Sequence, residues 1–251
     1  MTRVTMIAMT RMPGIATARF FPDFTAGLRK FGWTLALVAL SACTPQAALV
    51  SALLPDGTVS ALLSHLDKEQ DGNRKRILEM EARKDWDGIA KFADENLAKD
   101  RNNADWWFIA GYAHSEAGRH QRAIECYSEM VRLAPDDLLA SISLAQAYRT
   151  TKQPLRAVQT LNNVLRTSKG TPGIYFLLGE SYSDLDRDLP ASAAYREAVQ
   201  LDGQFANAWY GLGRAYARLG RREDYEKALT ALGKLDPALA KQLAELRPGR
   251  R

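Results

Sequence analysis

The chain has 251 residues, of which 46% are hydrophobic, and this is enough for one or two domains with a buried core. Its formal net charge of +5 first suggests a nucleic-acid partner. However, residues 1–42 contain five of the 34 basic residues and one of the 29 acidic residues, which leaves 29 basic and 28 acidic residues in the remainder. A nearly neutral body offers no basic surface to phosphates, so we expect no nucleic-acid binding.

The segment that ends at Cys43 is typical of an export signal. Residues 28–43 read LRKFGWTLALVALSAC, in which Arg29 and Lys30 precede a short apolar run and then small residues. This order is that of a secretory signal peptide. The apolar run is too short to cross a bilayer, and Pro45 opposes the alternative of a longer, uncleaved membrane helix. We expect residues 1–42 to be a leader and signal peptide, although residues 1–27 fit no export pattern themselves.

The residues LSAC that end at Cys43 resemble the lipobox of bacterial lipoproteins. The resemblance implies that Cys43 carries a diacylglyceryl group on its sulfur and is the first residue of the mature protein. Because Thr44 rather than Asp follows the cysteine, it also implies the periplasmic face of the outer membrane, with an inner-membrane anchor as the alternative. Residues 43–73 are expected to be a tether with short apolar helices. The second cysteine, Cys126, is expected to be a small packing residue.

From Ala104 to Pro237 one pattern recurs every 34 residues. The period is marked by small residues at Gly111, Ala145, Gly179 and Gly213. Within each unit the apolar residues lie three and four apart, with a turn in the middle, so each unit is predicted to be two amphipathic helices. A helix pair of this size cannot bury its apolar face alone, so neighbouring units must stack to share a core.

These units resemble the tetratricopeptide repeat, whose Trp, Leu-Gly, Tyr, Ala, aromatic, Ala and Pro slots they match in order. In the first unit the slots hold, among others, Trp107, Gly111, Ala123, Tyr127 and Pro135. Two departures are His114 in the Tyr slot of the first unit and Tyr225 in the Ala slot of the fourth. The resemblance covers Ala104 to about Leu239. It implies an all-α fold, a right-handed superhelical solenoid of helix pairs.

The same register sets the expected organisation of the chain. A degenerate first repeat at residues 74–103 is expected to contain helices near 74–83 and 86–98, since a terminal repeat of a solenoid is usually atypical. Four clear repeats follow at 104–137, 138–171, 172–205 and 206–239. Residues 237–246 are expected to form a helix that covers the last repeat, and residues 240–251 are assigned to this cap and the tail.

The sequence contains no motif for catalysis or for a cofactor. The histidines, His65, His114 and His120, do not pair with each other or with a cysteine at metal-ligand spacing. The glycine-rich stretch from Gly211 to Gly220 is not preceded by a strand, as a nucleotide-binding loop would be. We therefore expect no catalytic residue, no metal, no cofactor and no small-molecule substrate.

The family resemblance implies that the first helix of each pair lines a concave groove. Matching the slots that do not serve the core gives a candidate protein-binding surface of ten residues: Phe108, Tyr112, Ile142, Gln146, Arg149, Phe176, Glu180, Tyr210, Arg214 and Arg218. Aromatic and arginine side chains are the types that carry most binding energy in protein interfaces. The convex face and the tether remain alternative binding surfaces.

We expect a non-enzymatic, membrane-anchored scaffold or adaptor in the periplasm that binds protein partners and assists assembly of an envelope complex. The chain is similar to lipoproteins that assist pilus secretin assembly, outer-membrane protein insertion or recruitment of cell-wall hydrolases. The alternative is an accessory subunit that presents a substrate to a separately encoded envelope enzyme. A fold of this kind does not choose between these roles.

Overall fold

A computed structural model describes residues 71–246 and 248 of the chain. The chain divides into two compact units, Met1–Pro45 and Gln46–Arg251, and every described residue belongs to the second. The predictions for the leader, for Cys43 and for the tether up to residue 70 therefore lie outside the described residues.

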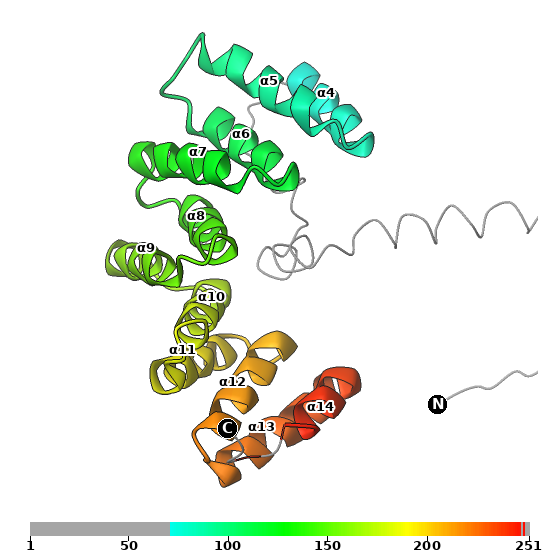
Figure 1. Ribbon diagram of the computed structural model, residues 1–251, viewed down its shortest axis with the longest axis vertical. Coiled ribbons are helices and arrows are strands. Elements are labelled where there is room, and N and C mark those ends of the chain that lie inside the picture. Colours follow the sequence, from blue (N-terminus) through cyan, green and yellow to red (C-terminus); the bar gives the residue numbers. More distant parts are fainter. Residues whose placement is uncertain (1–70, 247, 249–251) are drawn as a thin grey trace, which may run out of the picture. The chain divides into compact units, whose positions relative to one another are not determined.

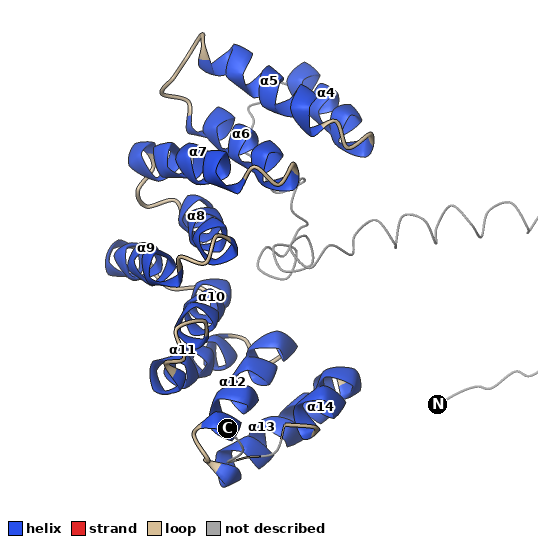
Figure 2. Ribbon diagram, viewed as in Figure 1, coloured by secondary structure: helices blue, strands red, loops and turns tan. Residues whose placement is uncertain are grey.

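The described residues form eleven α-helices and no strand, which confirms the all-α prediction (Figures 1 and 2). In chain order the helices are α4 (Asp71–Ala82), α5 (Trp86–Leu97), α6 (Ala104–Glu116), α7 (His120–Leu133), α8 (Leu138–Thr150), α9 (Pro154–Thr167), α10 (Pro172–Ser183), α11 (Asp188–Leu201), α12 (Ala206–Arg218), α13 (Arg222–Leu235) and α14 (Pro237–Ala244). Helices α4 to α13 make five pairs, in which we call the first helix A and the second helix B. Consecutive helices pack together, and the A helices α8, α10 and α12 also contact the next A helix, α14 in the last case.

The turn between helices A and B has the same conformation in all five pairs. Each turn has one residue with a positive φ, and these residues lie 34 apart: Lys84, Gly118, Lys152, Asp186 and Gly220. The N–H that follows donates to a carbonyl five residues earlier, as from Arg119 to His114 at 2.8 Å, which is a Schellman helix end. Because Lys84 falls in this series, α4 and α5 keep the register of the other pairs despite their divergent sequence.

The glycines of the 34-residue period lie where tyrosine rings of the B helices cross the A helices. A Cβ added at Gly111 would lie 2.6 Å from the Tyr127 ring, and one at Gly179 would lie 2.6 Å from the Tyr195 ring. Tyr195 is completely buried, and its ring also covers Gly211 of the next A helix. Glycine is the residue that permits this approach, so the close helix contact predicted from the small-residue slots is confirmed at Gly111 and Gly179.

The last repeat is closed by α14 instead of by a further pair. A Cβ added at Gly213 would meet the side chain of Leu243, which comes from α14. Tyr225, the departure in the Ala slot, is buried and donates its hydroxyl to the Leu243 carbonyl at 2.8 Å. The larger side chain at this slot therefore fastens the final helix to the solenoid.

The buried apolar side chains form two clusters. One contains side chains from Ile77 to Ala147, and the other contains side chains from Ile142 to Leu243. The two clusters meet at α8, which contributes Ala147 to the first and Ile142 to the second, while Tyr148 packs against both. Helix α8 is therefore the boundary between two cores.

Candidate functional site

Three of the ten predicted groove residues belong to the core, with 6%, 4% and 4% of their surface exposed: Phe108, Ile142 and Phe176. The ring centroid of Phe108 lies 5.7 Å from that of Tyr127. The centroid of Phe176 lies 6.0 Å from that of Tyr195 and 5.0 Å from that of Phe205. The prediction that these side chains face solvent is wrong, because their slot on helix A turns into the apolar core, where Phe108 and Phe176 meet the tyrosine of helix B. They join helices and offer no surface to a partner.

Arg149, Glu180 and Arg214 form an ion-pair network across three successive A helices. Arg149 on α8 donates from Nη2 to Glu180 Oε2 at 3.1 Å and from Nε to Asp184 Oδ2 at 2.7 Å. Arg214 on α12 donates from Nη2 to Glu180 Oε1 at 2.9 Å. The side chains of Arg149, Glu180 and Arg214 are 12%, 17% and 27% exposed, so these charges are largely removed from water and depend on one another. The network ties α8, α10 and α12 together.

Tyr195 joins this network from helix α11. Its hydroxyl donates to Glu180 Oε1 at 2.5 Å and accepts from Arg214 Nη2 at 3.3 Å. Burial, and then the nearby Glu180 carboxylate, raise the pKa of Tyr195, so the hydroxyl keeps its proton. At the edge of the network, Arg218 donates to Asp188 Oδ1 at 3.2 Å. Arg149, which we expected to be an open binding residue, is thus a brace between repeats.

Tyr112 lies in a separate polar group at the amino-terminal end of the solenoid. Its hydroxyl donates to Glu81 Oε1 on α4 at 2.9 Å, and its ring meets that of Trp86 edge-on, with centroids 5.9 Å apart. Burial raises the pKa of Glu81, although the hydrogen bond from Tyr112 opposes this effect, and burial also raises the pKa of Glu116. Tyr112 therefore keeps one side in contact with neighbouring helices and remains half-buried.

The predicted residues that keep partly exposed surface, some of which also take part in the network, share neighbouring slots on the A helices. Tyr112, Gln146 and Arg214 occupy one slot in three repeats, and Tyr210 lies one turn before Arg214. The Arg214 Cζ atom lies 5.9 Å from the centroid of the Tyr210 ring, at the outer limit of a cation–π contact. We call Tyr112, Gln146, Tyr210, Arg214 and Arg218 the A-helix face.

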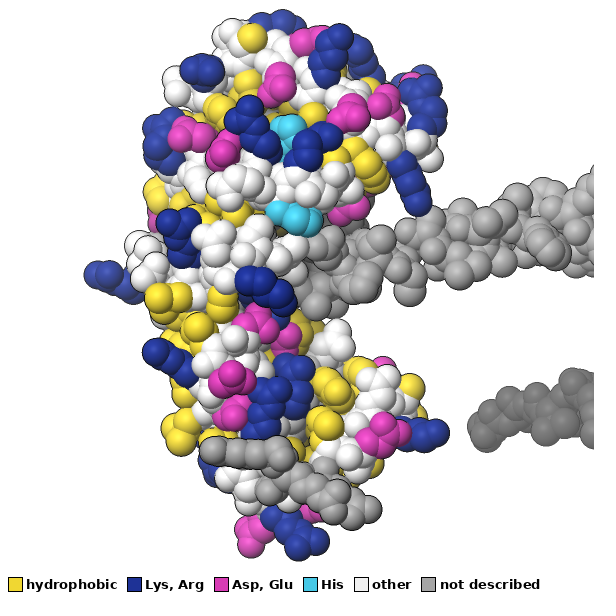
Figure 3. Space-filling model, viewed as in Figure 1, with side chains coloured by type: hydrophobic (Ala, Val, Ile, Leu, Met, Phe, Trp, Pro, Cys, Tyr) yellow, Lys and Arg dark blue, Asp and Glu magenta, His cyan; other side chains and the backbone are white. Residues whose placement is uncertain are grey.

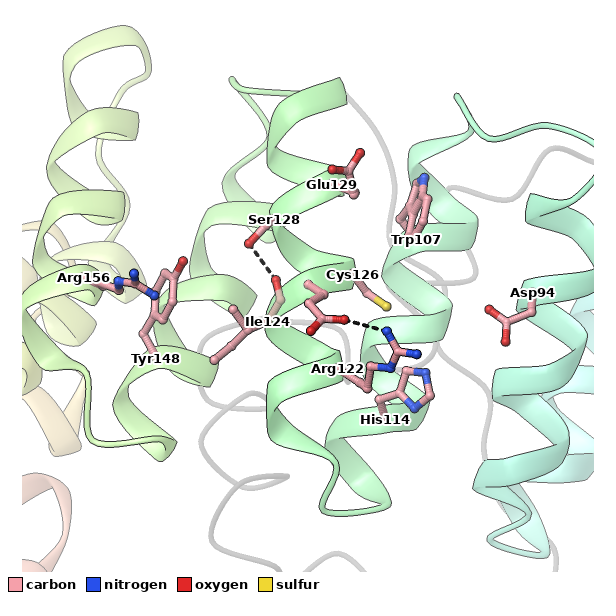
Figure 4. Close-up of a pocket in the computed structure, with 11 residues that line it drawn as sticks. Asp94, Trp107, His114, Arg122, Ile124, Cys126, Ser128, Glu129, Tyr148 and Arg156 are labelled. Carbon is pink, nitrogen blue, oxygen red and sulfur yellow. Dashed lines mark hydrogen bonds and ion pairs between the residues drawn. The ribbon is translucent and has the colours of Figure 1, made fainter.

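A depression of about 650 Å³ lies among α5, α6, α7, α8 and α9 (Figure 4). Its walls include Asp94, Trp107, His114, Cys126, Tyr148 and Arg156. Within it, Arg122 and Glu125 form an ion pair at 2.8 Å, with both side chains at least half exposed. An exposed pair of this kind contributes little to stability. The depression is lined by charged side chains together with the aromatic rings of Trp107 and Tyr148.

Two residues of this depression can be assigned structural roles. His114 Nδ1 accepts a hydrogen bond from Arg119 Nε at 2.8 Å, and Arg119 Nη1 pairs with Asp87 on α5 at 2.6 Å. Burial, and then the charge of Arg119, lower the pKa of His114. Cys126 is 7% exposed, and burial raises its pKa to about 11, so its thiol is a packing group, as its place on a repeat helix suggested.

The described residues present charged side chains of both signs at the surface. Among residues 71–246, no three His, Cys, Asp or Glu side chains lie together in a way that could hold a metal ion. On the face that Figure 3 shows, Lys and Arg side chains alternate with Asp and Glu side chains over the helices. Such a mixture suits contact with another polypeptide better than contact with a phosphate backbone.

The sequence reasoning missed the partners that complete these polar groups, among them Glu81, Asp87, Asp184, Asp188 and Tyr195. A signal for most of them exists in the sequence. The ion pairs between repeats are separated by 30 to 35 residues, as for Arg218 with Asp188 and Arg149 with Asp184. Opposite charges about one repeat apart on A helices therefore predict bracing contacts.

Models of the tetratricopeptide repeat family match residues 104–137, 172–205 and 207–238. The first two ranges coincide with two of the repeats expected from the 34-residue period. Residues 138–171 lie between the matched segments and form the pair α8 and α9, with the same positive φ in the turn at Lys152.

Curated relatives and solved structures agree with this assignment. The general transcriptional corepressor trfA of Dictyostelium discoideum is 28% identical over 140 residues, which are 55% of this chain but only 10% of trfA. MamA from Desulfovibrio magneticus RS-1 has a TM-score of 0.56 at 20% identity, over 72% of this chain and 97% of that one. YrrB, a TPR protein with an unusual peptide-binding site, has a TM-score of 0.53 at 17% identity, over 62% of this chain and 84% of the YrrB chain. At these identities the two structures show the fold alone, a solenoid of helix pairs, and the three matched segments of that solenoid are tetratricopeptide repeats.

Proposed function

We propose that the chain is a non-enzymatic adaptor that binds a protein partner through the A-helix face and assists assembly of an envelope complex. Tetratricopeptide repeats mediate protein–protein interactions. The proposal rests on the difference in exposure between two neighbouring slots of the A helices. The slot of Phe108, Ile142 and Phe176 is filled by core and is partly exposed only at Tyr210 of the fourth repeat, whereas Tyr112, Gln146 and Arg214 stay partly exposed one turn further on.

The A-helix face has the properties of a pre-organised binding surface. Arg214 is held by Glu180 at 2.9 Å and by the Tyr195 hydroxyl at 3.3 Å, and it lies beside the half-buried Tyr210 ring. Side chains that are already fixed lose little conformational entropy when a partner binds. Aromatic and arginine side chains are also the commonest anchors of protein interfaces. YrrB, whose structure resembles this one, has a peptide-binding site, which supports the same kind of partner.

We infer further that the solenoid is held by lipid at the periplasmic face of the outer membrane. The support is the sequence LRKFGWTLALVALSAC that ends at Cys43. None of the helices in residues 71–246 has the length and apolar composition needed to cross a bilayer. If the proposal holds, Cys43→Ser will move the protein from the membrane fraction to the soluble periplasm or leave the precursor unprocessed. Normal maturation and sedimentation of this variant with outer membranes would contradict it.

Site-specific photocrosslinking tests the binding surface directly. We expect a photoreactive phenylalanine analogue placed at Tyr112 or at Tyr210 to capture the same partner protein in cells. The control position is Gln159, an exposed residue on helix B of the second repeat. Capture at Gln159 with none at Tyr112 or Tyr210 would move the binding surface to the B helices. If the captured partner were an envelope enzyme whose activity depends on the adaptor, the role would be that of an accessory subunit.

A further inference from the structure

The contacts that brace neighbouring repeats are unevenly distributed along the solenoid. Arg149 and Glu180 connect α8 to α10, and Glu180 and Arg214 connect α10 to α12. At the amino-terminal end, Tyr112 connects α6 to α4 through Glu81. Between α7 and α8, the side-chain contacts among the described residues are apolar. The junction of the first and second repeats is therefore built differently from the junctions that follow it.

The slots that carry the ion-pair brace hold uncharged residues at this junction. Arg149 and Glu180, which pair across the second and third repeats, lie 34 residues after Ser115 and Gln146. A serine and a glutamine in these two slots cannot form an ion pair. The strongest polar connection between A helices is thus absent at the first junction because of the residues in its slots.

The ring contact between the third and fourth repeats is not repeated at this junction, nor at the next one, where the slot of Phe205 holds Thr171. Phe205, which precedes α12, packs its ring on Phe176 with centroids 5.0 Å apart. The residue in the equivalent place before α8 is Asp137, whose carboxylate caps α8 by accepting from the N–H groups of Leu139 and Ala140 at 2.7 and 3.2 Å. Asp137 therefore caps α8, and because its side chain has no ring it makes no aromatic contact with the neighbouring repeat.

The division of the core falls next to this junction, inside α8, which contributes Ala140, Leu144 and Ala147 to the first cluster and Ile142 to the second. The two apolar clusters meet at α8, and the depression of Figure 4 spans the junction, with Trp107 and Cys126 on one side and Tyr148 and Arg156 on the other. Rotation at the α7–α8 contact breaks no side-chain hydrogen bond or ion pair between the described residues of these two helices, and the apolar contact that remains there has no preferred direction.

We propose that the junction between α7 and α8 is the hinge of the solenoid, about which α4–α7 moves relative to α8–α14. The A-helix face extends across this hinge, with Tyr112 on one side and Gln146, Tyr210, Arg214 and Arg218 on the other. Bending therefore changes the distance between the two parts of the face, and so sets the length and curvature of the partner segment that fits. Domain closure at a small number of contacts is a common way to adapt a binding surface.

The repeat itself supplies a matched pair of distance measurements. Lys91, Gln159 and Lys227 are exposed, occupy the same slot of a B helix, and lie 68 residues apart. Spin labels at Lys91 and Gln159 lie on opposite sides of the hinge. Labels at Gln159 and Lys227 are separated by the same number of repeats, but both lie on the same side of the hinge. In the full chain carrying Cys43→Ser and Cys126→Ala, we expect the distance distribution from electron–electron double resonance to be about twofold wider for the first pair than for the second.

A second variant transfers the brace to the hinge. Ser115→Arg with Gln146→Glu places the Arg149–Glu180 pair in the equivalent slots, and should narrow the Lys91–Gln159 distribution to the width of the Gln159–Lys227 distribution. Equal widths for the two label pairs in the unbraced protein would overturn the hinge, and this comparison stands even if the braced variant fails to fold. A braced, folded variant with an unchanged wide distribution would also overturn it. Neither result depends on whether the A-helix face binds a partner.

Discussion

Replacing Gly179 by alanine should destabilise the fold, although alanine is the better helix former. Gly179 lies inside α10, where the exchange alone would stabilise the helix by about 1 kcal/mol. The added Cβ, however, would lie 2.6 to 2.9 Å from three atoms of the Tyr195 ring. That ring cannot move aside, because it is completely buried, also covers Gly211, and is held at its hydroxyl by Glu180.

Overpacking of this kind costs about 1–3 kcal/mol, so the net loss for Gly179→Ala is about 0–2 kcal/mol. Gly233→Ala is the matched control, since Gly233 lies inside α13 and nothing within 4 Å would meet its Cβ. Because no contact opposes it, the higher helix propensity of alanine should raise the free energy of unfolding of this variant by up to about 1 kcal/mol. The difference between the two variants, about 1–3 kcal/mol, isolates the contact between Gly179 and Tyr195.

Urea unfolding followed by circular dichroism measures both free energies under one set of conditions. The expected result is opposite signs for the two glycines, with Gly179→Ala below the wild type and Gly233→Ala above it. In a folded part of this size, a loss of 1 kcal/mol corresponds to a fall of about 2–4 °C in Tm. Equal effects of the two substitutions would refute the assigned repeat register, because the register alone distinguishes the two positions.

Three further predictions concern the braces, the turns and the histidine. Glu180→Gln should cost about 1–3 kcal/mol in urea unfolding, because Arg149 and Arg214 would lose a shared, largely buried charge; no loss would show that these pairs do not brace the repeats. Lys152→Gly should stabilise by up to about 1 kcal/mol, because φ is 58° at Lys152, whereas Gly118→Ala should destabilise by about 1 kcal/mol although its Cβ would meet nothing within 4 Å. His114 has a native pKa below its usual value, so its contribution to stability is complete above the unfolded pKa of about 6.5 and is lost as the pH falls below it. His114→Gln should therefore lose less stability than the wild type between about pH 7.5 and about pH 5.5, and equal losses in the two proteins would contradict the assignment.

Much of the fold could be predicted from the sequence because the same helix pattern recurs every 34 residues, so each unit supports the assignment of equivalent positions in the others. The 34-residue period placed Gly111 and Gly179 at close helix contacts, and these contacts are present. The departure at Tyr225 could not be interpreted in advance, because its partner is the backbone of α14 and not another repeat residue. The series of positive φ angles was also not visible, since Lys84 and Lys152 are not residues that favour this conformation.

The candidate site was predicted less well, for a physical reason. A slot pattern assigns a residue to a helix face, but it does not show whether the face meets solvent or the next repeat. Phe108 and Phe176 were placed on the open face, and the structure packs them against tyrosine rings. Arg149 was expected to contact a partner, and it is held by Glu180 and Asp184. Charged residues on adjacent helices pair with each other, and such pairing depends on distances that a single sequence does not contain.

Binding of a protein partner by the A-helix face can be measured as the affinity of Tyr210→Ala for the partner captured in the crosslinking experiment. The matched control is Leu189→Ala, which truncates the most exposed large apolar side chain of the described residues, on helix B of the third repeat. We predict that Tyr210→Ala weakens binding by about tenfold or more while its circular dichroism spectrum is unchanged, and that Leu189→Ala changes the affinity by less than about twofold. Full affinity of a folded Tyr210→Ala variant would contradict binding by the A-helix face. A loss of affinity for Leu189→Ala would instead place the binding surface on the B helices.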